Sequence, residues 1–396
     1  MSQAVISSMG MVSAIGNSCS DALKALKEGR SGIEPLRFLQ TAHCEFPVGE
    51  VKMSNEQMCS LLGIPQDAVT TRTSLMGMLA VKEALQEIDL QEKGKRIALI
   101  SGTTVGGMDK SEQYYLDFLS NDNRNAYIST HDCGACSEMI ADYFGIFTFV
   151  NSISTACSSA ANAILLGAEL IKSGRVDMVV AGGSECLTKF HLNGFNTLMI
   201  LDKEPCRPFD ASRAGLNLGE GAAYVVIESA ESADKRGIEP LCVLKGYGNA
   251  CDAYHQTASS PDGNGAFLAM KQALANAKLQ PEDIDYINAH GTGTQNNDLS
   301  EGRAIERVFG DNIPPISSTK SFTGHTTSAA GGVEAVISIL ALRENFIPLN
   351  LNFSKSMPEL SFTPSVDMET KKPLTNILSN SFGFGGNDTS LIFSKL

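Results

Sequence analysis

Short apolar runs alternate with longer amphipathic or small-residue segments along the whole of this 396-residue chain. The short runs are rich in Val, Ile and Leu, which is typical of strands buried in a sheet, and the longer segments have the length of helices. The predicted strands span residues 96–101, 176–181, 222–228, 241–245 and 284–288, and the predicted helices span residues 157–172, 265–278 and 328–343. Regular alternation of this kind favours an α/β architecture.

The pattern begins again near residue 238, which suggests an internal duplication. Each half contains a polar turn that leads into an Ala- and Gly-rich helix, once at Cys157 and once at His325. We therefore expect two units, residues 1–238 and residues 239–396, and the length of the chain is ample for a sizeable core.

Composition and charge exclude several classes of protein. The chain carries 31 Lys and Arg against 44 Asp and Glu, a net charge of −13, and shows no basic stripe of the kind that nucleic-acid-binding proteins use. No apolar run reaches transmembrane length, and the first six residues predict a strand rather than a secretion signal. Ten cysteines at irregular spacing are typical of reduced thiols. We therefore expect a cytoplasmic protein that binds neither nucleic acids nor membranes.

The most informative residue is Cys157, at the start of a predicted helix. It lies in the run STACSSAA, residues 154–161, shortly after the β-prone residues 146–150. A nucleophile at a sharp turn between a strand and a helix has its side chain directed into a cleft, and Cys157 has this position. The free N–H groups and the macrodipole at a helix start favour thiolate over thiol. A buried and inert cysteine is the common alternative.

Two histidine motifs downstream favour the nucleophile. His290 lies in the run NAHGTGT next to a predicted strand, and His325 lies in the run SSTKSFTGH just before a predicted helix. Lys320 and Glu334 fall around the start of that same helix. A cysteine and two loop histidines make a plausible nucleophilic constellation.

The pair Cys133 and Cys136, with His131 nearby, is a candidate redox pair or half of a zinc site. A second cysteine pair at zinc spacing does not follow, so we expect no metal and favour helical packing for this segment.

The chain resembles the β-ketoacyl-acyl-carrier-protein synthases, type II-like condensing enzymes of the thiolase-like superfamily. It contains the Cys157, His290 and His325 motifs and four others in the order in which they occur in that family. The other four are AGGSE at residues 181–185, RPFD at 207–210 with GEGA at 219–222, SPDGNGA at 260–266 and NSFGFGG at 380–386. The resemblance covers nearly the whole chain. It implies the thiolase-like fold, in which two similar βαβαβαββ halves form five αβαβα layers and the active site lies where the halves meet.

The resemblance also implies a reaction, the decarboxylative Claisen condensation of malonyl-acyl-carrier protein with an acyl chain held as a thioester on Cys157. His290 and His325 would donate hydrogen bonds to the enolate that forms when CO₂ leaves. Lys320 would place positive charge near the departing malonyl carboxylate or adjust the protonation of the histidines. The backbone N–H groups of Cys157 and Phe384 would form the oxyanion hole, and Phe384 would also gate the pocket.

Further residues would bind the substrate. Thr292 and Thr294 would contact the pantetheine arm, and Val105 and Phe195 would line the acyl pocket. Turn formation by the two threonines and core packing by the other two residues are the alternatives. No cofactor is implied, because the substrates arrive on the phosphopantetheine of the acyl carrier protein.

Glu334 is expected to support the site. It lies nine residues beyond His325, too far along one helix for direct contact, so Lys320 or a water molecule would link the two. A purely structural ion pair between Lys320 and Glu334 is the alternative.

The expected partners are an acyl carrier protein and a second subunit, most simply in a homodimer and alternatively in a heterodimer with a related subunit. In the family, residues 133–143 and the strand before Cys157 lie at a two-fold interface, and the chain keeps apolar residues there.

Some positions depart from the primary fatty-acid enzyme. Gly293 and Asn297 replace the usual Ser and Gly, and residues 52–72 contain few of the basic residues that often dock the carrier. Either fatty-acid synthesis or a specialised type II polyketide pathway, such as that of the aryl polyenes, is compatible with this pattern.

The main alternative function is a non-catalytic partner subunit that resembles a chain-length factor. Such subunits lack the nucleophilic cysteine, so the presence of Cys157, His290 and His325 argues against it. A cysteine hydrolase would leave the second histidine unexplained, and a thiolase would need a second cysteine near its end, whereas the last cysteine here is Cys251.

Overall fold

A mixed β-sheet of ten strands runs through the computed structural model, which describes residues 3–86, 88, 94–368, 370 and 372–396. The strands are β1 (Ala4–Ser13), β2 (Ile97–Gly102), β3 (Phe149–Ile153), β4 (Met178–Glu185), β5 (Gly221–Ser229), β6 (Cys242–Cys251), β7 (Tyr286–Asn288), β8 (Ile316–Ser317), β9 (Asn376–Gly383) and β10 (Asn387–Ser394).

Twelve α-helices surround the strands within the same described residues. They are α1 (Cys19–Lys27), α2 (Asn55–Leu62), α3 (Arg72–Leu85), α4 (Met108–Ser120), α5 (Cys133–Phe144), α6 (Ser159–Lys172), α7 (Lys189–Thr197), α8 (Ala230–Lys235), α9 (Asn264–Ala277), α10 (Gln295–Phe309), α11 (Lys320–Thr323) and α12 (Ala330–Glu344). Short 3-10 turns are η1 (Asn125–Thr130), η2 (Pro281–Asp283), η3 (Thr327–Ala329) and η4 (Phe384–Gly386).

The strand order shows that the sheet consists of two copies of one arrangement. The order is β3-β2-β4-β5-β1 followed by β6-β10-β9-β7-β8. When the five strands of each half are numbered 1 to 5 in chain order, both halves have the same order in the sheet. From the outer edge to the joint between the halves, that order is 3-2-4-5-1. At that joint β1 and β6 pair through only two residue pairs, Val5 with Val243 and Ile6 with Cys242. The predicted fold with two similar halves is therefore confirmed, and a short ladder joins their sheets into one.

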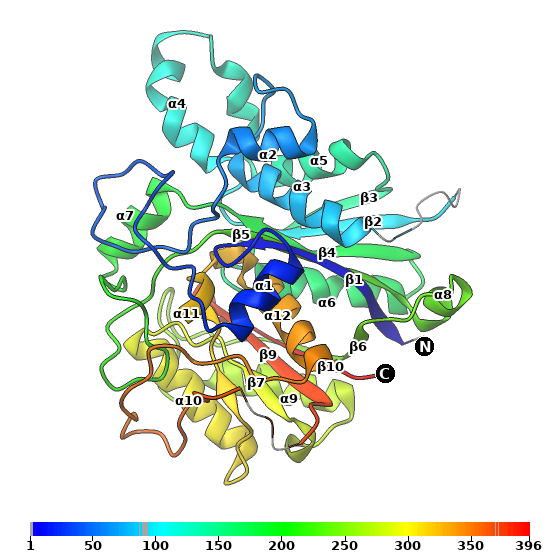
Figure 1. Ribbon diagram of the computed structural model, residues 1–396, viewed down its shortest axis with the longest axis vertical. Helices are drawn as coiled ribbons and strands as arrows, with labels where there is room; N and C mark the ends of the chain where they lie inside the picture. Colours follow the sequence, from blue (N-terminus) through cyan, green and yellow to red (C-terminus); the bar gives the residue numbers. More distant parts are fainter. Residues whose placement is uncertain (1–2, 87, 89–93, 369, 371) are drawn as a thin grey trace.

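Helices lie in three layers that enclose the two halves of the sheet (Figure 1). Helices α3 and α5 cover the outer face of the first half, α6 and α12 pack between the halves, and α9 and α10 cover the outer face of the second half. The result is the five-layered αβαβα arrangement of the thiolase-like fold that the family resemblance implies.

The central layer requires small residues because α6 and α12 approach closely. Every residue of α12 from Ala330 to Leu342 is buried. A Cβ atom on Gly331 would come within 2.7 Å of Ala161 on α6. The N-terminal ends of these two helices follow Cys157 and His325, so their close packing brings the two residues together where the halves meet.

Element boundaries differ from the prediction in two informative places. Strand β6 continues to Cys251, well past the predicted end at residue 245, because it pairs with β10 over its whole length. Helix α6 begins at Ser159 rather than at Cys157, because a tight turn occupies the first residues. No helix in the described part of the chain is long and apolar enough to cross a membrane.

The close packing of the central helices leads to a stability prediction. Gly331→Ala should lower the free energy of unfolding by about 1–3 kcal/mol, because the added methyl group overpacks the contact with Ala161. Gly194→Ala on α7 is the matched control, since nothing lies within 4 Å of the added Cβ. It should be neutral or stabilising by up to about 1 kcal/mol. Urea unfolding measures both, and equal losses in the two variants would contradict the packing argument.

Candidate active site

Cys157 lies in a tight turn between β3 and α6. Ala156 has a φ of 52°, a left-handed conformation that few non-glycine residues adopt. The turn is closed by the N–H of Ser159, which donates to the carbonyl of Ala156 at 3.2 Å. This strained turn directs the thiol inward, where only 6% of Cys157 is exposed.

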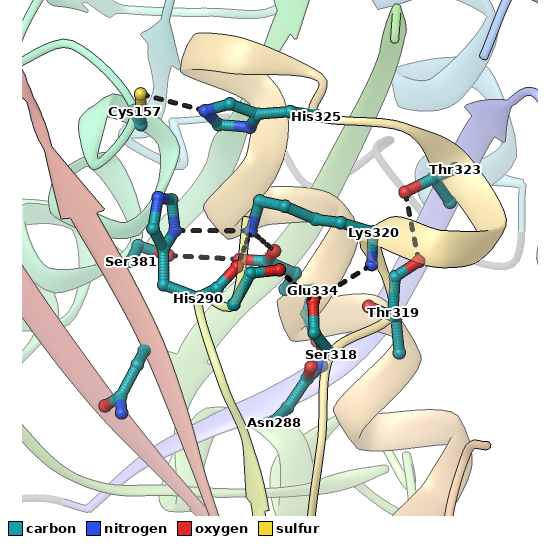
Figure 2. Close-up of polar contacts among 12 residues, drawn as sticks. Cys157, Asn288, His290, Ser318, Thr319, Lys320, Thr323, His325, Glu334 and Ser381 are labelled. Carbon is teal, nitrogen blue, oxygen red and sulfur yellow. Dashed lines mark hydrogen bonds and ion pairs between the residues drawn. The ribbon is translucent and has the colours of Figure 1, made fainter. Parts of the chain in front are cut away.

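His325 faces the thiol directly. Its Nε2 lies 3.0 Å from the Sγ of Cys157 (Figure 2). The backbone of His325 is held on both sides, because its N–H donates to the carbonyl of Asn217 and its own carbonyl accepts from the N–H of Gly219. Its Nδ1, in contrast, is buried without a hydrogen-bond partner among the described residues.

Lys320 connects the second histidine to an acid. Its Nζ lies 3.2 Å from the Nδ1 of His290 and 2.5 Å from the His290 carbonyl oxygen, and it forms a buried ion pair with Glu334 (Figure 2). An ammonium group can only donate hydrogen bonds, so Nδ1 of His290 must accept and the ring proton must lie on Nε2. The link that the sequence suggested between Glu334 and His325 therefore leads to His290 instead.

The rings of the two histidines meet edge to face, with centroids 5.3 Å apart. The free end of the His290 ring points toward Cys157 and His325 (Figure 2). His290 thus presents an N–H group to the space beside the thiol.

A further acid, Glu301 on α10, holds the His290 loop and was missed in the sequence. Its carboxylate accepts hydrogen bonds from the backbone N–H of His290 at 2.9 Å, from the N–H of Gly291 at 2.8 Å and from the Asn380 side chain at 3.2 Å. Burial raises its pKa to about 7. The only signal in the sequence is an acidic residue on the apolar face of an amphipathic helix.

Burial determines the protonation states of Cys157, His290 and His325. It raises the pKa of the Cys157 thiol to about 11, although the charge of Lys320 and the N–H groups of Phe384 and Cys157 act in the opposite direction. Burial and the Lys320 charge hold the pKa values of His290 and His325 well below the usual range. At neutral pH the thiol and both imidazoles are therefore uncharged. The helix start was expected to favour the thiolate, but Cys157 precedes the helix and the loss of solvation dominates.

The same backbone N–H groups, those of Cys157 and Phe384, lie close enough to the thiol sulfur to lower its pKa. Two convergent N–H groups beside a nucleophile can stabilise a negatively charged oxygen that forms there. A neutral imidazole on the other side can take the thiol proton. The arrangement therefore suits attack by sulfur on an acyl group.

A cavity of about 410 Å³ opens over the thiol. Most of the residues predicted from the sequence line it, namely Cys157, His290, His325, Thr292, Thr294, Phe195 and Phe384. Lys320 and Glu334 lie behind the histidines. Val105 is buried away from the cavity lining, and its N–H donates to Glu185.

One side of the cavity is polar. The hydroxyl groups of Thr292 and Thr294 lie 2.9 Å apart, and Thr294 also caps α10 by accepting from the N–H of Asn297. Gln295 and Asn296 line the cavity beside them. These hydroxyl and amide groups can exchange hydrogen bonds with an entering polar chain.

Phe384 lies over the thiol beside two glycines in left-handed conformations, Gly385 with φ of 79° and Gly386 with φ of 76°. Its ring stacks on Phe195 with centroids 5.7 Å apart and an angle of 22°. Movement of Phe384 therefore requires the two rings to separate.

Cys157, His290 and His325 form the one cluster of at least three potential metal ligands within the described residues, with ligand atoms within 4.8 Å of one another. This donor set does not suit a cation. His290 presents an N–H rather than a lone pair, and the positive charge of Lys320 lies directly behind it. Cys133 and Cys136 are both free thiols on α5.

Comparison with known proteins gives matches along the whole chain. Residues 1–233 match the family description "Beta-ketoacyl synthase, N-terminal domain", and residues 241–354 match "Beta-ketoacyl synthase, C-terminal domain". A nodulation protein E from Rhizobium meliloti (strain 1021) is 35% identical over 412 residues, which cover 99% of each chain. A 3-oxoacyl-[acyl-carrier-protein] synthase 2 from Coxiella burnetii (strain RSA 493 / Nine Mile phase I) is 35% identical over 410 residues, which cover 99% of this chain and 98% of the relative.

Among solved structures, the ishigamide ketosynthase/chain length factor superimposes with a TM-score of 0.91 at 29% identity. The superposition covers 100% of this chain and 99% of that chain. The likeness therefore includes both halves and the site between them.

The raised pKa of the thiol leads to a prediction about its reactivity. Alkylation of Cys157 by iodoacetamide should accelerate about tenfold per pH unit and should still be rising at pH 10, because the thiolate fraction grows up to a pKa of about 11. Peptide mass spectrometry follows the modified residue. The urea-denatured chain serves as the control, where the rate should level off near the ordinary cysteine pKa of about 8.5. A native rate that reaches its plateau by pH 9 would contradict the account.

Proposed function

The chain belongs to the β-ketoacyl synthase family and is a condensing enzyme that transfers acyl groups, and we propose that Cys157 is the residue that carries the acyl chain. The observation that supports this most directly is the contact of 3.0 Å between the Cys157 thiol and the neutral His325, at the floor of a cavity that His290 also lines.

In the first step Cys157 takes the acyl chain from its carrier. The sulfur forms a bond to the thioester carbon, and the bond from that carbon to the pantetheine sulfur breaks. The thiol proton passes through Nε2 of His325 to the departing sulfur. The N–H groups of Cys157 and Phe384 stabilise the oxygen that becomes negative during this exchange.

In the second step a malonyl thioester loses CO₂. The bond to the carboxylate carbon breaks, and its electron pair moves onto the thioester oxygen to give an enolate. His290 is suited to donate to this oxygen, because Lys320 keeps its proton on Nε2. No residue in the described part of the chain fixes the Nδ1 of His325, so its ring proton can reside on either nitrogen. It can therefore accept the thiol proton in the first step and donate in the second.

In the third step the enolate carbon attacks the acyl group on Cys157. A carbon–carbon bond forms, and Cys157 leaves as a thiolate. One proton from solvent, delivered through His325, restores the thiol. Burial in an uncharged pocket favours this return, because the thiol is more stable than the thiolate there.

The polar side of the cavity supports an acyl carrier protein as the source of both substrates. The hydroxyl groups of Thr292 and Thr294 and the side-chain amides of Gln295 and Asn296 offer donors and acceptors for the two amides of a pantetheine arm. The relative from Coxiella burnetii is named for an acyl-carrier-protein substrate. The same groups suit a carrier of either a fatty-acid or a type II polyketide pathway.

The edge of the sheet supports a two-subunit assembly. Among the described residues, strand β3 pairs with β2 alone, which leaves its other edge open to them, and Phe149 on this strand is 43% exposed. Open apolar edges are commonly closed by a second chain. We propose a homodimer through this edge, and a related subunit would use the same surface, as the name of the ishigamide ketosynthase/chain length factor suggests for that protein.

The division of labour between the residues can be tested with two variants. His290→Ala should lower the release of CO₂ from a malonyl thioester about 10²–10³-fold, as expected for the loss of one donor to a developing oxyanion. Acylation of Cys157, followed by mass spectrometry, should continue in this variant. In Cys157→Ala the acyl mass should disappear. Labelling that survives in Cys157→Ala, or wild-type CO₂ release by His290→Ala, would contradict the assignment.

The assembly prediction concerns the open edge. Phe149→Glu should convert the dimer to monomers, because a carboxylate at the edge cannot be buried without a partner. Leu268→Glu on α9 is the matched control, since Leu268 is similarly exposed on the opposite outer layer and should leave the dimer intact. Light scattering measures both. A wild-type monomer, or a dimer unaffected by Phe149→Glu, would rule out this interface.

A further inference from the structure

A third histidine, His191, lies close to the site, although none of the sequence motifs includes it. It is on α7 and only 6% of it is exposed. The start of this helix is firmly held. The Thr188 side chain accepts from the N–H of His191 at 3.0 Å, and the Glu112 carboxylate accepts from the N–H groups of Lys189 and Phe190.

The ring of His191 contacts the first of the two stacked phenylalanines. Phe195 follows one helical turn later, so the two side chains share a face of α7. Their ring centroids are 6.1 Å apart and the rings are nearly perpendicular, at 87°. Phe195 in turn stacks on Phe384, which lines the same cavity as Cys157. A continuous series of three rings therefore leads from the buried histidine to the thiol.

We propose that His191 is a positioning residue for the acyl gate: it holds Phe195 in the orientation that stacks on Phe384 and so keeps the gate closed until an acyl chain enters. The inference rests on the proposed roles of Cys157 and Phe384. It adds a residue from outside the motifs that controls which thioester reaches Cys157.

Histidine suits this position better than a hydrocarbon side chain. The ring lies beside the backbone of Cys186, the residue that follows β4. It meets the ring of Phe195 edge to face. A leucine would fill the space but would offer no aromatic edge.

The surroundings connect His191 to the rest of the site. Glu185 at the end of β4 lies near enough to His191 to interact with it electrostatically. The same buried carboxylate accepts from the hydroxyl of Thr103 at 2.8 Å, from the N–H of Thr104 at 2.7 Å and from the hydroxyl of Ser328. Ser328 is three residues beyond His325. His191 thus lies near a carboxylate that also holds the chain just after His325.

Loading selectivity tests the proposal. The purified chain is offered hexanoyl and malonyl thioesters of N-acetylcysteamine together, and mass spectrometry measures the ratio of hexanoyl to malonyl or acetyl groups on Cys157. His191→Leu should lower this ratio at least fivefold, because Phe195 is then free to turn. His191→Phe should retain most of the selectivity, because an aromatic edge remains against Phe195.

Two controls separate positioning from loss of stability. Leu26→Ala creates a cavity in α1, away from the cavity lining, and should lower stability while leaving the ratio unchanged. Phe195→Leu should lower the ratio by itself, and adding His191→Leu to it should have no further effect, because His191 acts through Phe195.

Several results would overturn the inference. One is a ratio in His191→Leu that equals the wild-type ratio. Another is a fall of the ratio in Leu26→Ala or in His191→Phe that is as large as the fall in His191→Leu. The last is an additive effect of the two substitutions in the double variant. Should His191→Leu fail to fold, His191→Phe and Phe195→Leu decide the question by themselves. If the wild-type chain acquires no acyl group on Cys157 at all, the proposed function fails instead.

Discussion

The ion pair between Lys320 and Glu334 is the interaction on which the site depends. Both groups are almost completely buried, so each would be strongly destabilising alone, and removal of one partner from such a pair typically costs about 3–5 kcal/mol. The lysine uses its remaining hydrogen bonds on the ring and carbonyl oxygen of His290. One buried charge therefore fixes the position of His290 and the nitrogen that carries its proton. It also helps to keep both histidines uncharged. This contact explains why the two histidines differ. His290 is a hydrogen-bond donor with one fixed tautomer, whereas the tautomer of His325 can vary.

The duplicated fold explains how this pair comes to face the thiol. Cys157 precedes α6 in the first half, and His325 precedes α12 in the second. The two helices pack together through Ala161 and Gly331 at a distance that larger side chains would not allow. Loops from the second half supply His290 and Phe384. Since residues from both halves complete the site, the packing of the central layer determines the chemistry as much as the loops do.

Local sequence signals identified much of this arrangement. Cys157, His290, His325 and Lys320 lie in motifs rich in small and polar residues, and alternating strands and helices indicated the α/β class. The role of Phe384 and the five layers were expected from the family resemblance. What the sequence did not reveal depends on long-range contacts. Glu301 and His191 act through partners far along the chain or through a ring stack, and no spacing encodes such contacts. The pKa of Cys157 was predicted in the wrong direction, because the loss of solvation depends on what the folded chain places around the thiol. Strand β6 proved longer because β10, almost 140 residues away, pairs with its end.

Lys320 holds His290 as a neutral imidazole with its proton on Nε2. Nitrogen NMR of the chain labelled in its six histidine rings tests this directly, with the His290 signals assigned by comparison with His290→Gln. We expect one protonated nitrogen, Nε2, and one unprotonated nitrogen, Nδ1, with no change between pH 6 and pH 8. In Lys320→Met this single tautomer should be lost. A His290 ring that carries its proton on Nδ1, or that becomes an imidazolium within this pH range, would contradict this role of Lys320.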